Sequence, residues 1–240
     1  MSRVLVEIAV TGLPDGLAAA RAGADRLEVS SALSVGGVSP SLGLVKSLIR
    51  ETGLPVVVLL RARPGGFEAD RDDLRVMLAD AEAYSAAGAE GLAFGFTRDG
   101  GIDQEACAAV RKVMGQAKAV FHRAFDRLVD PTAALDELVD LGFHRVLTSG
   151  GPPTALQGID TLRRLVEKSA GRLDIVAAGG VRVGNAQALL ATGLKQLHAS
   201  CKAPFESVGG LVGQEDPERV DLGQVAELAR VVREGNGSVE

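Results

Sequence analysis

The sequence predicts a single-domain α/β protein of the TIM (β/α)8-barrel class. Short runs rich in Val, Leu and Ile alternate with longer stretches of Ala, Leu and charged residues along the chain. This alternation gives about eight strand–helix units of roughly 30 residues each, which matches the repeat of such a barrel. The chain has 240 residues, of which 46% are hydrophobic, and is therefore long enough to bury one large core.

Each expected strand is a short apolar run that leads into a helix-like stretch. In chain order the expected strands are 3–10, 25–30, 55–61, 91–96, 118–124, 144–149, 173–179 and 195–200. The clearest helices are expected at 15–23, 70–88 and 130–142, because their apolar residues recur at i, i+3 and i+4 and each segment ends in Gly. Asp130 is the expected N-cap of the third helix, ahead of Pro131.

An open, doubly wound sheet is the alternative architecture. Such a sheet usually has fewer strands and a G-x-G-x-x-G fingerprint after its first strand. The segment that follows the first expected strand, TGLPDG at 11–16, lacks this spacing. We therefore favour one barrel domain over 1–240, with a polar tail at 234–240.

The composition argues against several classes of partner. The net charge is −5 with both signs interspersed, and one Tyr and seven Phe offer few rings for base stacking, so no nucleic-acid partner is expected. The longest apolar run, PVVVLL, is too short to span a bilayer, and the N-terminus lacks the features of a signal peptide. Cys107 and Cys201 lie far apart without a C-x-x-C motif, so we expect free thiols and a cytoplasmic protein.

Ionisable residues lie between apolar neighbours in several expected strands. Because side chains alternate along a strand, the apolar neighbours are expected to face the helices and the ionisable residues to face the barrel interior. These positions lie near the C-terminal strand ends, where the active sites of barrel enzymes form. The expected inward set is Glu7, Glu28, Arg61, His122 and His198.

Each of these residues alone has an ordinary structural explanation. An inward histidine is often a hydrogen-bonded core group, and a Glu–Arg pair is often a structural ion pair. Five ionisable side chains at one end of a barrel are harder to explain in this way, because burying unpaired charges is costly. Asp126 follows His122 in the next loop and is expected either to orient its imidazole or to cap a helix. A shared functional site is predicted.

Three Gly-rich loops are expected to border the same mouth and to offer an anion site. They are RARPGGF at 61–67, TSGGPPTALQGI at 148–159 and AAGGVRVGNAQAL at 177–189. Backbone N–H groups at a helix start, as in the third loop, bind phosphate readily. Solvated arginines and plain tight turns are the alternative interpretation. The candidate anion-binding residues are Arg63, Ser149, Gly150, Gly179 and Gly180.

Two familiar barrel chemistries are disfavoured. A Schiff-base aldolase needs an inward lysine at a strand's C-terminal end, but Lys118 and Lys195 open their strands and Lys202 falls beyond the last one. Zinc hydrolysis usually needs a histidine cluster such as H-E-x-x-H, which is not found here. No nucleotide or PLP cofactor is indicated, whereas a metal site is still open. The candidate ligands of such a metal are Glu7, Glu28, His122 and His198.

Several motifs together resemble the CutC family, which is named for copper homeostasis. They are GADRLEVSSALSVGGVSPSLGLVKSL (23–48), RARPGGF (61–67), FHRAFD (121–126), RVLTSG (145–150) and LHAS (197–200). The resemblance runs from the first strand to the eighth. It implies a TIM barrel, a cytoplasmic homo-oligomer, and a role in copper tolerance or copper binding.

Two functions therefore remain open. In the first, the protein binds copper through His198 and Cys201, with or without His122 as a third ligand, although Cu(I) prefers softer ligands than most of these. In the second, the protein is an enzyme acting on a small anionic metabolite. Glu28 and His122 then exchange protons, Glu7 supports them, and Arg61 holds the anion with the Gly179–Gly180 loop. An oligomeric scaffold with a vestigial site is a third possibility.

Overall fold

Eight parallel strands close into a barrel in the order β1-β10-β9-β8-β7-β4-β3-β2, which confirms the predicted fold class. This computed structural model describes residues 3–68, 70–203 and 219–235. Each barrel strand pairs with the strands before and after it along the chain, apart from a small inserted hairpin. The strands are β1 (Leu5–Val10), β2 (Arg26–Val29), β3 (Val56–Leu59), β4 (Gly91–Phe94), β7 (Lys118–Phe121), β8 (Arg145–Thr148), β9 (Asp174–Ala177) and β10 (Gln196–Ala199).

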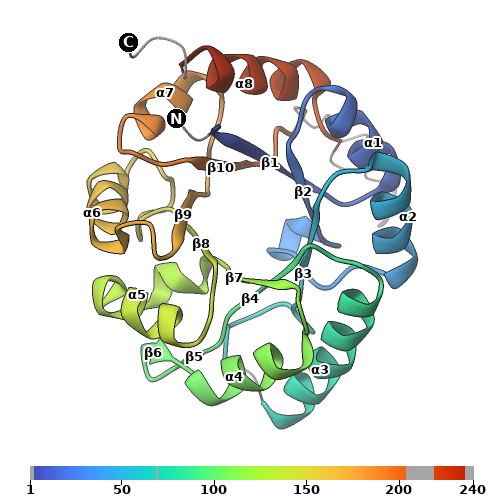
Figure 1. The fold of residues 1–240 in the computed structure, drawn as a ribbon, viewed down its shortest axis with the longest axis vertical. Coiled ribbons are helices and arrows are strands. Elements are labelled where there is room, and N and C mark those ends of the chain that lie inside the picture. The colour runs from blue at the N-terminus through green and yellow to red at the C-terminus, as the bar shows by residue number, and fades with distance from the viewer. Residues whose placement is uncertain (1–2, 69, 204–218, 236–240) are drawn as a thin grey trace, which may run out of the picture.

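Helices surround the strands as an outer ring, and the view along the barrel in Figure 1 shows this arrangement. Local signals set several helix starts. Asp70 accepts hydrogen bonds from the first turn of α3, and Asp130 does the same for α5, where Pro131 follows it as predicted. The helices are α1 (Leu13–Arg21), α2 (Leu42–Thr52), α3 (Arg71–Ala86), α4 (Gln104–Val113), α5 (Pro131–Asp140), α6 (Ile159–Ser169), α7 (Val183–Leu190) and α8 (Leu222–Gly235).

The loops after the strands hold structure that the sequence pattern did not predict. The hairpin β5 (Thr97–Arg98) and β6 (Gly101–Ile102) follows β4, and short 3-10 turns follow β2 and β7. The strands also end earlier than expected, so Arg61 and His122 lie in loops. The N–H of Arg61 donates to the hydroxyl of Ser39 at 3.0 Å, and His122 becomes the N-cap of the turn after β7. The expected tail at 234–240 overlaps the end of α8, and 236–240 lie outside the described residues.

Two apolar layers hold the barrel together. The larger one lies between strands and helices and includes the outward side chains Val6, Ile8 and Phe121. The smaller one fills the barrel interior with side chains such as Val57 and Val176. The interior cluster is confined to strands β3, β4, β7, β8 and β9 and their ends. The interior near β1, β2 and β10 is instead occupied by polar side chains.

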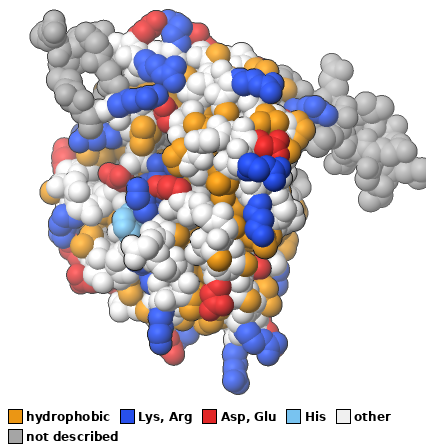
Figure 2. All heavy atoms as spheres, turned by 45° about the vertical axis from the view of Figure 1, so that its right-hand side comes forward, with side chains coloured by type: hydrophobic (Ala, Val, Ile, Leu, Met, Phe, Trp, Pro, Cys, Tyr) orange, Lys and Arg blue, Asp and Glu red, His pale blue; other side chains and the backbone are white. Residues whose placement is uncertain are grey.

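The surface in Figure 2 carries Lys and Arg side chains interspersed with Asp and Glu side chains, without a patch of one sign on the face shown. This distribution agrees with the modest net charge of −5. Among the residues that the structure describes, no helix is both long and apolar enough to cross a membrane.

Candidate functional site

A cavity of about 340 Å³ opens at the C-terminal ends of the barrel strands. Its size falls within the range of small-molecule sites, which is roughly 300–1,000 Å³. Four of the five predicted inward residues share this cavity, and they are Glu28, Arg61, His122 and His198. The fifth, Glu7, lies beneath it with 2% of its surface exposed.

Strand register brings Glu7 and His198 together. The two residues are paired partners on β1 and β10, and Nδ1 of His198 lies 2.7 Å from Oε1 of Glu7. On the other side of the imidazole, Nε2 lies 4.0 Å from Oε1 of Glu28, which β2 supplies. Glu7, Glu28 and His198 each offer one ligand atom within 4.8 Å of the others. Two carboxylates thus flank one imidazole at the mouth.

The two carboxylates have opposite proton affinities. Burial alone would raise the pKa of Glu7, but the adjacent Arg26 and His198 outweigh burial and lower it. For Glu28, burial dominates, the charge of Glu7 adds to it, and the pKa rises to about 7. Oε2 of Glu28 is buried and has no hydrogen-bond partner among the described residues. Burial lowers the pKa of His198, but Glu28 and Glu7 outweigh it and raise the pKa. The cluster can hold a proton near neutral pH.

His122 differs from His198, because its surroundings favour the neutral ring. Burial lowers its pKa to about 3, and the charge of Arg61 adds to this effect. Its Nδ1 accepts the N–H of Ala124 at 3.3 Å, and its ring packs against Phe67 with 4.9 Å between centroids. These surroundings do not favour the exchange of protons with Glu28 that was predicted for His122.

Arg61 is held by backbone carbonyls. Its Nη1 donates to the carbonyl of Gly37 at 2.9 Å, its Nη2 donates to that of Gly65 at 2.6 Å, and its guanidinium lies 5.2 Å from the ring centre of Phe67. Its buried Nε has no partner among the described residues. No ion pair of Arg61 occurs among them either. A cation fixed in this way can receive an anionic ligand.

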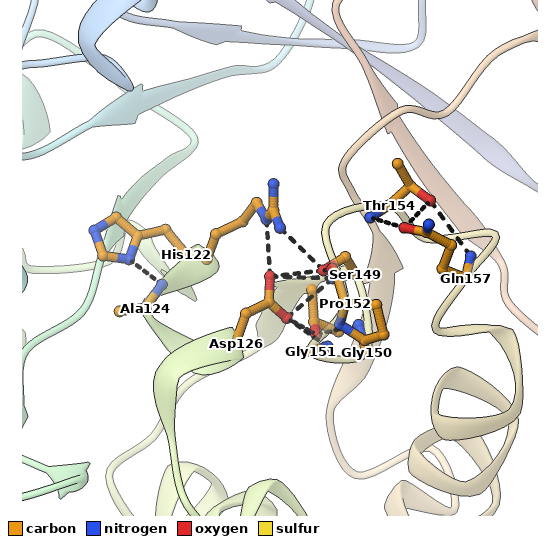
Figure 3. A network of polar contacts seen from close by, with 11 residues as sticks. His122, Ala124, Asp126, Ser149, Gly150, Gly151, Pro152, Thr154 and Gln157 are labelled. Atoms are coloured by element: carbon orange, nitrogen blue, oxygen red, sulfur yellow. Dashed lines mark hydrogen bonds and ion pairs between the residues drawn. The ribbon is translucent and has the colours of Figure 1, made fainter.

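Asp126 does not reach His122, which corrects one part of the predicted site. Figure 3 shows Asp126 directed toward Ser149, with the ring of His122 turned away from it. Asp126 pairs with Nε of Arg123 at 2.8 Å and accepts from the hydroxyl of Thr148 at 2.5 Å. It also accepts the N–H groups of Ser149 and Gly151. Its role in the structure is to fix the loop after β8.

The same contacts alter the expected role of the β8 loop. The N–H of Ser149 donates to Asp126, and the N–H of Gly150 donates to the hydroxyl of Thr148 at 2.8 Å. These two amides therefore already have acceptors and are not available to an anion. Arg63 is also outside the cavity lining, because it turns outward to pair with Asp73 at 2.8 Å.

Gly179 and Gly180 do lie at the cavity, as the sequence predicted. Both have positive φ angles, 96° and 68°. A Cβ on Gly179 would lie 3.1 Å from Nη1 of Arg123, so the glycine allows this arginine to approach the loop. Arg123 also lines the cavity, with Nε and Nη2 fixed by Asp126 and Ser149. It was not predicted from the sequence, because the expected strand ran to residue 124 and strand alternation placed Arg123 on the face opposite His122.

His198 and Cys201 are not brought together in the cavity. Cys201 packs in the core between strands and helices and does not line the mouth. Burial, then the charge of Asp221, raises the pKa of its thiol to about 11. Cys107 is also buried, and its pKa rises to about 12. Copper ligation by the predicted His198–Cys201 pair is therefore not supported by their placement.

Arg26 belongs to the site although the sequence did not identify it. Its Nε donates to Oε2 of Glu7, and its Nη2 donates to Oε1 of Gln196 at 2.6 Å. Strand parity could have predicted the inward position of Arg26, because Arg26 and Glu28 lie two residues apart on one face of β2.

The fold and this site define a parallel α/β barrel with ionisable residues around a ligand-sized cavity at the strand ends. Residues 4–203 match the sequence model that defines the CutC family. The chain belongs to the CutC family.

Relatives of the chain cover most of its length. A Treponema denticola protein named as a CutC family protein is 42% identical over 200 residues, which span 82% of this chain and 81% of the relative. The human copper homeostasis protein cutC homolog is 39% identical over 205 residues, which span 85% and 75%. The crystal structure of a putative copper homeostasis protein CutC from Streptococcus agalactiae matches with a TM-score of 0.79 and 32% identity, over 82% of this chain and 98% of that one.

A more distant structure shows the fold alone. Thiamine phosphate pyrophosphorylase from Pyrococcus furiosus matches with a TM-score of 0.61 at 17% identity, over 97% of this chain and 96% of that one. Barrels of this shape support many unrelated reactions, so the likeness does not assign a reaction.

Proposed function

We propose that the protein is an enzyme that binds a small anionic metabolite at the barrel mouth and uses Glu28 as its general base. The proposal rests on the environment and the pKa of Glu28. Its carboxylate faces the cavity, one of its oxygens is buried without a partner among the described residues, and its pKa is about 7. A base works best when its pKa lies near the working pH. A buried, partnerless carboxylate oxygen is costly in a purely structural role.

The neighbours of Glu28 support this role. His198 stands between Glu28 and Glu7, with its Nδ1 fixed by Glu7 at 2.7 Å. A proton taken up by Glu28 is therefore next to the imidazole of His198, whose orientation is fixed by Glu7 on the opposite side of the ring. Arg26 keeps Glu7 ionised, since its charge lowers the pKa of Glu7. This arrangement resembles other sites in which the environments of two carboxylates drive their pKa values apart.

The cavity also contains cations for an anionic substrate. Arg61 and Arg123 enter the lining from the loops after β3 and β7, and both are fixed by hydrogen bonds. Fixed cations bind an anion without the entropy cost of ordering a flexible side chain. Gly179 and Gly180 let the backbone approach the same space. A compact carboxylate or phosphate ester fits this combination of charge and volume.

Exchange of substrate hydrogen with solvent tests the proposal. Proton abstraction alone causes this exchange, so the product of the reaction need not be known. The protein is incubated in D₂O with a panel of small phosphorylated and carboxylated carbonyl compounds, and proton NMR records loss of their C–H signals. Wild type should exchange at least one compound, and Glu28→Gln should abolish exchange while it retains binding. Arg61→Met should weaken binding, whereas Arg63→Met, outside the cavity, should not. Exchange that persists in Glu28→Gln would refute the proposal.

Copper binding at the mouth is the second candidate, favoured by the three ligand atoms of Glu7, Glu28 and His198. Relatives with copper homeostasis names make this candidate relevant. Two carboxylates and an imidazole suit Cu(II) better than Cu(I), which prefers thiolates. The ion pair of Glu7 with Arg26 opposes it, because Arg26 competes with the metal for the carboxylate.

Metal titration separates the two candidates. Anaerobic Cu(I) competition and aerobic Cu(II) titration are measured for wild type, Glu28→Gln, His198→Ala and Cys201→Ala. Tight binding that Glu28→Gln and His198→Ala both weaken would support a copper site at the mouth. Binding no tighter than that of an unrelated barrel protein would exclude it. A cytoplasmic location and a homo-oligomeric state stay predictions, which cell fractionation and light scattering can check.

A further inference from the structure

His122 has one ring nitrogen committed to the backbone. Nδ1 accepts the N–H of Ala124 at 3.3 Å, in the first turn of the segment that follows β7. An imidazole nitrogen that accepts a hydrogen bond carries no proton, so the proton of the neutral ring lies on Nε2. Within the described part of the chain, Nε2 makes no hydrogen bond, and His122 lines the mouth cavity. His122 thus brings to the cavity lining an N–H donor that has no partner among the described residues.

The surroundings keep this ring neutral and fixed. Arg61 is the charged group that faces it, and the rings of Phe67 and Phe121 pack beside it. Gly95 makes room for it, since a Cβ there would lie 3.0 Å from Nδ1. A protonated ring would place an N–H on Nδ1 against the N–H of Ala124 and a second charge beside Arg61. Protonation is therefore opposed by both the hydrogen bond and the charge.

We infer that His122 donates its Nε2–H to the carbonyl oxygen of the substrate, and that the substrate is therefore a small anionic aldehyde, ketone or 2-oxo acid. This inference rests on the proposed function, in which Glu28 is the base. Glu28 takes a proton from the carbon next to the carbonyl, and the C–H electron pair becomes a C=C bond. The carbonyl π pair moves to oxygen as negative charge, which His122 and Arg61 stabilise. Glu28 returns the proton to the same carbon, and the C–H and C=O bonds re-form. Where that carbon bears a hydroxyl group whose proton passes to the former carbonyl oxygen, Glu28 instead protonates the former carbonyl carbon, and the new C=O bond forms at the hydroxyl position.

This assignment explains why the mouth contains two histidines in different states. His198, between two carboxylates, has a raised pKa and suits proton exchange. His122, beside an arginine, suits donation of a hydrogen bond without loss of its proton. A neutral imidazole is a better match than imidazolium for an enolate oxygen that must later release its charge, and triosephosphate isomerase uses a neutral imidazole in this way. The reaction needs no cofactor, since the atoms and electrons only rearrange.

The protonation state can be measured on the wild type. Protein labelled with ¹⁵N-histidine is recorded by long-range ¹H–¹⁵N NMR between pH 5 and 9, and His122→Gln assigns the signal. We expect the Nε2–H form without titration over this range. His144 is the internal control, because its Nδ1 also accepts a backbone N–H at 3.3 Å but the residue is exposed. A proton on Nδ1, or titration of His122 in this range, would overturn the inference.

Ligand probes test the carbonyl assignment. The probes are inorganic phosphate, glycolohydroxamate and phosphoglycolohydroxamate, of which the hydroxamates mimic an enediolate. A hydroxamate should shift the Nε2 signal of His122, and His122→Phe should weaken its binding or the exchange rate by about 100-fold. His122→Gln, which keeps an N–H donor, should lose less. Phosphate binding without any hydroxamate effect on His122 would overturn the inference and leave the proposed anion site standing. Failure of every probe to bind would overturn both.

Discussion

Glu7 and His198 are register partners on the first and last strands of the barrel, and a hydrogen bond of 2.7 Å joins their side chains inside it. Arg26 binds the other oxygen of Glu7 from β2. One carboxylate therefore links three adjacent strands and also sets the orientation of an imidazole at the mouth. The pairing of these strands and the orientation of His198 depend on the same buried group.

Removal of one member of the Glu7–Arg26 pair should be strongly destabilising. Both side chains are nearly fully buried, with 2% and 6% of their surfaces exposed. Glu7→Gln leaves the guanidinium without its counter-charge, and such changes cost about 3–5 kcal/mol. Urea denaturation measures the loss. The double variant Glu7→Gln/Arg26→Gln should recover part of it, whereas additive losses would show that the two residues do not interact.

Glu28 should make the protein less stable as the pH rises toward neutrality. Its pKa is raised from 4.5 to about 7, so its contribution is fully present below pH 4.5 and is lost as the pH rises through 7. Glu28→Gln removes this loss. The variant should match wild type near pH 4.5 and exceed it by about 1–3 kcal/mol at pH 8. Unfolding curves across this range check the prediction, and a constant difference would contradict it.

Neither thiol should react in the folded protein. Cys107 and Cys201 are buried, and their pKa values are raised to about 12 and about 11. The thiolate is the reactive form, so a disulfide reagent such as DTNB should label both only after unfolding. Absorbance of the released thiol, measured with and without denaturant, tests this. Rapid labelling of native protein that disappears in Cys201→Ala would show that this cysteine is accessible.

Gly95→Ala should disturb the ring of His122. The added Cβ would lie 2.9 Å from Cζ of Phe121 and 3.0 Å from Nδ1 of His122, and overpacking of this kind costs about 1–3 kcal/mol. Thermal unfolding should show the loss, and the NMR signal of His122 should move. Gly66→Ala is the matched control, because a Cβ there meets only the backbone N of Glu68 at 4.0 Å. Equal effects of the two changes would contradict a specific role for the space beside His122.

Parity along the strands predicted the inward residues because it depends only on local geometry. Glu28 and His198 line the cavity for this reason, whereas Arg61 and His122 line it from loops, because their strands end before them. Parity gives neither the depth of a side chain within the barrel nor its charge partner. The position of Glu7 below the cavity and its ion pair with Arg26 were therefore not predicted. The resemblance to a copper-related family, not the strand geometry, suggested the pairing of Cys201 with His198.

Loop residues were predicted less well, because their side chains follow contacts made far away in the sequence. Asp126 is close to His122 along the chain, yet the N–H groups after β8 offer it more hydrogen bonds. One of those bonds occupies the amide of Ser149, which was expected to bind an anion. The positions of Gly179 and Gly180 were easier to predict, because positive φ angles restrict such a turn largely to glycine.

The contact of Arg26 with Gln196 extends to Asp174, to which the amide of Gln196 donates at 2.7 Å. This chain of polar groups crosses the seam where the first and last strands of the barrel meet. A growing chain on the ribosome cannot complete it before Gln196 emerges. Until then the guanidinium of Arg26 lacks one of its acceptors, and β1 lacks its neighbour β10. The barrel therefore cannot close until the segment that contains Gln196 has been synthesised, because β1 pairs with β10.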